Sequence, residues 1–109
     1  MHLLMITYQL QGISEADYLA QSKEDAAFLD FLATFPGFYS KVWLADTATN
    51  TYGGVYLWKD REAMEAFIHS DIIKAIDADP TLANLTIKDF AIAEDLSRVT
   101  RGIPQDAPA

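Results

Sequence analysis

Hydrophobic residues recur along this chain with two different spacings. Runs rich in apolar, β-branched and aromatic residues predict strands, whereas apolar residues that recur every three or four positions predict helices. Helical spacing follows Ser14, is clearest over residues 27–35, and returns in two pieces between Asp60 and Asp79. The predicted strands are residues 2–10, 38–46, 52–58 and 85–93.

Polar residues predict where the helices begin and end. Ser14 and Asp60 can cap helices, because a side-chain oxygen at that position accepts a hydrogen bond from a free amide of the first turn. A second start signal at residues 22–25 predicts a break in the first helical region near Gln21. Pro80 ends the last helical piece, because the residue before a proline avoids the helical conformation.

The order of elements is strand, helix, strand, strand, helix, strand. This order predicts an α+β fold of the ferredoxin-like βαββαβ type, with a four-stranded antiparallel sheet and helices on one face. We expect one domain over residues 1–96. Beyond Leu96 the chain becomes polar and contains prolines, so residues 97–109 are expected to form an irregular C-terminal tail.

Both faces of the predicted sheet carry apolar residues. In the first strand Leu4 and Ile6 point one way, while Leu3 and Met5 point the other. Two helices can cover only one face, and an uncovered apolar sheet face needs a partner. A second copy stacked sheet on sheet would cover it, so the sequence predicts a homodimer, the arrangement of a dimeric α+β barrel.

Composition narrows the classes of partner. The 109 residues carry 8 basic and 16 acidic side chains, a net charge of −8, which disfavours nucleic acid and anionic membrane surfaces. There is no cysteine, hence no disulfide, thiolate nucleophile or iron–sulfur ligand. The chain shows no signal-peptide pattern and no apolar run long enough to span a membrane, so a cytoplasmic protein is expected.

Motifs for familiar chemistry are missing. No metal-binding, nucleotide-phosphate or dinucleotide motif occurs, and we expect neither a metal nor an organic cofactor. The paired carboxylates fit solvated or capping positions. His2 stands beside the first residue and is expected to be exposed. His69 falls on the polar side of a helix, where a solvated role is favoured over one as acid or base.

The central hairpin carries the distinctive chemistry. Lys41 lies among its aromatic residues, on the same side of the strand as Tyr39 and Trp43. Two interpretations remain open: the lysine extends to solvent or an ion pair, or it is a cation in an aromatic pocket suited to a phenolate or quinone. The aromatic residues of the hairpin are Tyr39, Trp43, Tyr52, Tyr56 and Trp58.

These residues carry a resemblance. The chain resembles the YdhR family, small mono-oxygenase-like proteins of the dimeric α+β barrel superfamily. The resemblance implies the fold and dimer expected above. Relatives in this superfamily oxidise aromatic polyketides and quinols with O₂, without metal or flavin, in a site between sheet and helices. The matching segments are Lys41-Val42-Trp43, Gly53-Gly54-Val55-Tyr56-Leu57-Trp58 and Asp60-Arg61-Glu62-Ala63.

A second resemblance points to haem-degrading mono-oxygenases of the same superfamily. Residues 58–59 and 70–75 are similar to the region of their second helix. Those enzymes use an Asn on the first strand, a Trp on the second helix and an iron-ligating His after it. Here the corresponding residues are Thr7, Phe67 and Asp77. An aspartate is a poor replacement for a neutral imidazole on haem iron, which argues against haem degradation.

The sequence therefore favours a cofactor-independent mono-oxygenase that oxidises a small aromatic, phenolic or quinol substrate with O₂. Lys41 would be the catalytic residue and would favour the anionic form of the substrate. A non-catalytic small-ligand-binding or interaction module is the alternative, and a lyase or isomerase using His69 or a carboxylate is a third class. The expected substrate-binding residues are Thr7, Gln9, Trp43, Tyr56 and Phe67.

Overall fold

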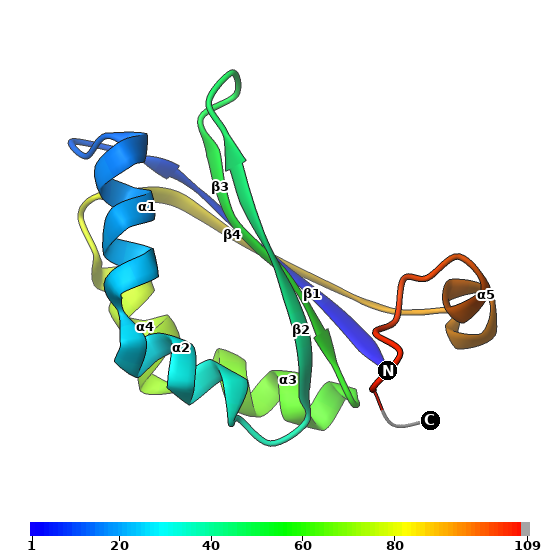
Figure 1. Ribbon diagram of the computed structural model, residues 1–109. Coiled ribbons are helices and arrows are strands. Elements are labelled where there is room, and N and C mark those ends of the chain that lie inside the picture. Colours follow the sequence, from blue (N-terminus) through cyan, green and yellow to red (C-terminus); the bar gives the residue numbers. More distant parts are fainter. Residues whose placement is uncertain (108–109) are drawn as a thin grey trace.

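The computed structural model describes residues 1–107. Four antiparallel strands form one sheet in the order β2-β3-β1-β4. Helices α1 to α4 lie on one side of this sheet, whereas α5 lies beyond the end of β4, near the N-terminus (Figure 1). The elements are β1 (His2–Leu10), α1 (Glu15–Glu24), α2 (Ala26–Ala33), β2 (Phe38–Asp46), β3 (Thr51–Trp58), α3 (Arg61–Ile68), α4 (Asp71–Ala78), β4 (Leu82–Ala91) and α5 (Glu94–Val99).

The predicted ferredoxin-like α+β fold is confirmed, and each predicted helical region is a pair of helices. Ser14 caps α1, its Oγ accepting a hydrogen bond from the Asp17 amide at 3.1 Å. The break in the first region lies at Asp25 rather than near Gln21. Asp25 caps α2 by accepting a hydrogen bond from the Phe28 amide at 3.0 Å, and the new cap redirects the chain across the sheet.

The structure differs from expectation at the C-terminal end. β4 begins at Leu82, earlier than predicted, because Leu82 and Ala83 pair with the last residues of β1. β4 ends at Ala91, and α5 follows it from Glu94 to Val99. The segment expected to be irregular from residue 97 therefore begins inside a helix. Ile103 in this segment is only 5% exposed. Residues 108–109 of the expected tail lie outside the described residues.

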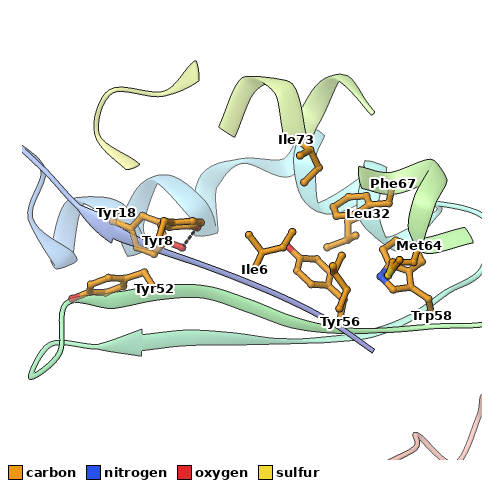
Figure 2. Close-up of a cluster of buried hydrophobic side chains, with 11 residues drawn as sticks. Ile6, Tyr8, Tyr18, Leu32, Tyr52, Tyr56, Trp58, Met64, Phe67 and Ile73 are labelled. Carbon is orange, nitrogen blue, oxygen red and sulfur yellow. Dashed lines mark hydrogen bonds between the residues drawn. The ribbon is translucent and has the colours of Figure 1, made fainter. Parts of the chain in front are cut away.

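The face of the sheet that the helices cover holds the core. Alternate residues of β1, among them Leu4 and Ile6, point to the helices and are almost fully buried. They pack with Trp58, Met64 and Phe67, which are the other fully buried large side chains (Figure 2). We call this side the covered face.

The other side, the open face, also carries apolar side chains. Val42 and Phe90 are 62% and 50% exposed, and the strand register places both opposite to the core residues. No helix within residues 1–107 is both long enough and apolar enough to cross a membrane. The two faces therefore have similar apolar composition but different cover.

Candidate functional site

A cavity of about 250 Å³ lies between the covered face of the sheet and the helices. Strands β1, β2 and β3 supply its floor, while α1, α2 and α4 supply its walls. Its lining is mostly aromatic and aliphatic with a few polar groups, as is typical of small-molecule sites. The aromatic and charged residues that line it are Tyr8, Tyr18, Phe28, Lys41, Trp43, Tyr56, Asp25 and Asp79.

Lys41 enters this cavity from β2. It pairs with Tyr56 across the β2–β3 register, and its ammonium lies 3.4 Å from the ring centroid of Trp43. The ring centroids of Tyr56 and Phe28 are 4.6 Å and 5.2 Å away. A cation within about 6 Å of an aromatic face is attracted by the ring quadrupole. Three rings thus hold one cation at the edge of the cavity.

Gly54 makes room for the lysine side chain. Trp43 and Gly54 face each other in the register, next to the Lys41–Tyr56 pair. A methyl group at Gly54 would collide with Lys41 Cε and would also come within 3.3 Å of its Cγ. Gly54 therefore provides the space in which the stem of Lys41 lies across the sheet.

Burial alters the acidity of Lys41. Removal from water disfavours the ammonium and lowers its pKa from 10.5 to about 7. The ion pairs formed within residues 1–107 do not include this lysine. Near neutral pH, Lys41 can therefore be present as a free amine or as an ammonium, and can accept or return a proton.

Tyrosine hydroxyls form the polar part of the cavity beyond Lys41. The hydroxyls of Tyr8 and Tyr18 are 2.6 Å apart, and both residues are 7% exposed (Figure 2). Tyr18 also packs edge-on against Tyr52, at a centroid distance of 5.3 Å. Burial raises the pKa of Tyr8, Tyr18 and Tyr56 above 10, so all three stay protonated at neutral pH.

The structure brings together three of the residues that the sequence suggested. Lys41, Trp43 and Tyr56 all line the cavity. Phe67 is not among its lining residues: it is fully buried on α3, with its ring centroid 5.3 Å from that of Tyr56, and packs against this tyrosine in the core. The roles of these residues in binding or catalysis stay predictions.

Thr7 and Gln9 lie elsewhere. They alternate with Tyr8 along β1 and therefore point to the open face, where they border a shallow hollow together with Asn84. Gln9 Oε1 accepts a hydrogen bond from the side-chain Nδ2 of Asn84 at 2.6 Å. A ligand in the cavity would meet Tyr8 rather than Thr7 or Gln9.

None of the three positions compared with the haem-degrading mono-oxygenases lines the cavity. Thr7 faces away from the cavity, Phe67 is buried in the core, and Asp77 is exposed on α4. Within residues 1–107, no group of three or more His, Cys, Asp or Glu is placed to hold a metal ion. The donor groups of the cavity thus offer no imidazole for haem iron.

The two histidines lie outside the cavity. His2 is 9% exposed, contrary to expectation, because its place on β1 directs it to the covered face. There its Nε2 lies 2.7 Å from Asp89 Oδ1. His69 follows α3 and is exposed, with its Nε2 3.5 Å from Glu65 Oε2. Neither histidine borders the cavity around Lys41.

Sequence reasoning missed Tyr8, Tyr18 and the two cavity carboxylates. Tyr8 could have been found, because it shares the face of Leu4 and Ile6, and a hydroxyl on a buried face needs a partner. Tyr18 carries no such signal, since its contact with Tyr8 depends on how α1 crosses the sheet.

Solved structures with the same fold include a cofactor-independent oxygenase and a haem degrader. SnoaB, a cofactor-independent oxygenase from Streptomyces nogalater, has a TM-score of 0.62 at 20% identity, over 84% of this chain and 92% of its own. A mutant of MhuD, the haem degrader of Mycobacterium tuberculosis, was solved with two manganese protoporphyrin IX molecules per active site. It has a TM-score of 0.66 at 16% identity, over 85% of this chain and 95% of its own.

A third structure, of a protein of unknown function from Nitrosomonas europaea, has a TM-score of 0.67 at 18% identity and covers 99% of this chain and 94% of its own. At these identities the similarity establishes a common fold. No curated protein has significant sequence similarity to the chain.

The family comparison is more specific than the structural one. Residues 3–103 match the family described as "Putative mono-oxygenase ydhR". Because this match spans nearly the whole length, the chain belongs to the YdhR mono-oxygenase family.

Proposed function

We propose that this protein is a cofactor-independent mono-oxygenase that oxidises a small phenol or quinol with O₂, and that Lys41 is its catalytic base. One observation carries the proposal: a partly buried lysine with a pKa of about 7 borders a cavity that has aromatic residues on both its sheet and its helix side. A base with a pKa near the working pH combines a useful unprotonated fraction with adequate basicity. The three rings around the ammonium then stabilise the charge that proton transfer creates.

The proposed reaction balances without an added reductant. The Lys41 amine takes the proton of the substrate hydroxyl, and the resulting anion, delocalised onto a ring carbon, gives one electron to O₂. The substrate radical and superoxide combine at that carbon as a peroxide, which takes a proton from the Lys41 ammonium. The hydrogen on the same carbon then leaves as a proton while the O–O bond breaks. A phenol becomes a quinone, and the second oxygen atom leaves as water.

Oxygen uptake with a panel of phenols and quinols tests this proposal. We expect at least one compound to support O₂ consumption, and mass spectrometry with ¹⁸O₂ to find one labelled oxygen in the product. Saturable binding of many compounds with no O₂ consumption would instead indicate a binding module. A product of unchanged mass would indicate an isomerase.

We also propose that the open face pairs with the open face of a second copy. Val42 and Phe90 are large apolar side chains, 62% and 50% exposed, on the face opposite to helices α1 to α4 (Figure 1). Pairing two such faces would remove apolar surface from water at about 25 cal/mol per Å². Light scattering should give the mass of a dimer at micromolar concentration and that of a monomer for Phe90→Glu; a monomeric parent protein would contradict the proposal.

A further inference from the structure

The hydroxyl of Tyr56 is available to a ligand. The Tyr56 side chain is 2% exposed and lines the cavity, yet its hydroxyl forms no hydrogen bond within residues 1–107. The fully buried side-chain polar atoms without a partner in this part of the chain are Trp58 Nε1 and Ser70 Oγ. The Tyr56 oxygen is not among them, so it borders the cavity, where a ligand could reach it.

The Tyr8–Tyr18 pair also has a donor to spare. Two phenol groups carry two protons, and the 2.6 Å contact between them uses one. Ser22 also forms a hydrogen bond with Tyr18 and lowers the Tyr18 pKa, the effect of a donor, so this contact does not use a phenol proton. Whichever tyrosine hydroxyl donates in the Tyr8–Tyr18 contact, the other therefore keeps a proton that it can donate elsewhere. Both residues line the same cavity as Tyr56. We call Tyr8, Tyr18 and Tyr56 the hydroxyl subsite.

Charge is distributed unevenly along the cavity. The backbones of Lys41 and Tyr56 share one row of the sheet, whereas Tyr8 lies in the row of Tyr52, four residues further along β3 or about 13 Å at 3.3 Å per residue. The Tyr56 hydroxyl nevertheless interacts electrostatically with Tyr8 and Tyr18. The Asp79 carboxylate acts electrostatically on Tyr8, so negative charge is unfavourable at that end. An anionic oxygen is favoured at the lysine end, and a neutral oxygen at the Tyr8 end.

We propose that the hydroxyl subsite donates hydrogen bonds to a second, neutral oxygen of the substrate, so that the site selects aromatic compounds with oxygens at two separated positions. The inference rests on the proposed function for the role of Lys41 at the first oxygen. It adds a requirement, because a phenol with one oxygen would leave the tyrosine hydroxyls without an acceptor. Unpaired donors in a closed site penalise the wrong ligand.

Calorimetric binding of naphthalene-1,5-diol and 1-naphthol, without O₂, tests the subsite apart from catalysis. We expect the diol to bind about three- to tenfold more tightly, the effect of one hydrogen bond. The single variant Tyr56→Phe should reduce this preference for the diol, and the double variant Tyr8→Phe/Tyr56→Phe should abolish it. In both variants the affinity for 1-naphthol should stay within about twofold of that of the parent protein. The Tyr56 hydroxyl makes no internal bond, so its removal should leave the melting temperature unchanged.

Tyr52→Phe is the matched control. The Tyr52 hydroxyl bonds Glu15 at 3.0 Å, outside the cavity, and the variant should keep the full preference for the diol. Equal affinity of the parent protein for the two compounds, or measurable binding of neither, would overturn the subsite. So would a preference that survives in the double variant. If the preference holds but no compound consumes O₂, the subsite stands and the mono-oxygenase proposal falls.

Discussion

The covered and open faces of the sheet have similar sequences and different properties. Each carries large apolar residues and one or more polar groups on neighbouring strands. Phe67 of α3, which packs against the covered face, is fully buried, and Lys41 on that face has a strongly lowered pKa. On the open face, Phe90 is 50% exposed and Lys88 extends into solvent.

The difference shows that the acidity of a side chain on this sheet depends on whether helices shield its face from water, and not on residue type alone. Helices α1, α2 and α4 remove water from one face and leave a cavity there, so a lysine on that face becomes a base. In the single chain, Lys88 on the other face is exposed. Matched substitutions on the two faces can therefore test the comparison directly.

The largest effect is expected for the buried phenylalanine. Phe67→Ala should lower the free energy of unfolding by about 3–5 kcal/mol, because it leaves a cavity beneath Tyr56 and Trp58. Phe90→Ala should cost well under about 1 kcal/mol in the monomer. Urea denaturation at a concentration where the chain is monomeric measures both. Equal losses would show that the two faces are equally packed.

The next effect concerns activity. Once a substrate is found, Lys41→Met should lower kcat by on the order of 10²-fold, the lower end of what a general base contributes, and Lys88→Met should leave it unchanged. In the parent protein, kcat should fall about tenfold per pH unit below the pKa of about 7, since the protonated amine cannot act as a base. Unchanged turnover in Lys41→Met would remove the lysine from the mechanism.

The sequence predicted the sheet well because strand patterns and hairpins are local. Lys41, Trp43 and Tyr56 share a face by simple alternation and short-range pairing, so their proximity could be expected. Alternation also puts Tyr8 on the covered face and Thr7 on the other, which makes Tyr8 the better candidate for a site beneath the helices.

The features of the site that the sequence could not predict depend on packing between segments that are distant in the chain. Tyr18 meets Tyr8 only because α1 crosses the sheet at one particular place. The depressed pKa of Lys41 follows from burial, and burial depends on helices contributed by segments on both sides of β2 in the chain. Neither effect leaves a signal in spacing or composition.

A smaller effect should follow from filling the space beside the lysine. In Gly54→Ala the new methyl group would displace the Lys41 stem, and the ammonium would move toward water. We expect kcat to fall about tenfold and the midpoint of the pH–rate profile to rise from about 7 toward 10.5. Gly102→Ala, where a methyl group meets only ordinary contacts, should change neither. A loss of kcat without a shift in the midpoint would contradict a positioning role for Gly54.

A further effect, of a few kcal/mol at about 1.4 kcal/mol per pKa unit, should appear in the pH dependence of stability. In the unfolded chain Lys41 has a pKa of 10.5, and in the folded protein about 7. Between these values the unfolded chain binds the proton and the folded protein does not, so lowering the pH favours unfolding. Below pH 7 both states hold the proton, and the penalty stays constant.

The stability of the parent protein relative to Lys41→Met should therefore rise from pH 7 to pH 10 and be flat between pH 5.5 and pH 6.5. The nearby tyrosines do not complicate this window, since burial raises the pKa of each above 10. If the difference between the parent protein and Lys41→Met is flat from pH 6 to 10, the covered face does not depress the pKa of its lysine, and the contrast between the two faces is one of packing alone.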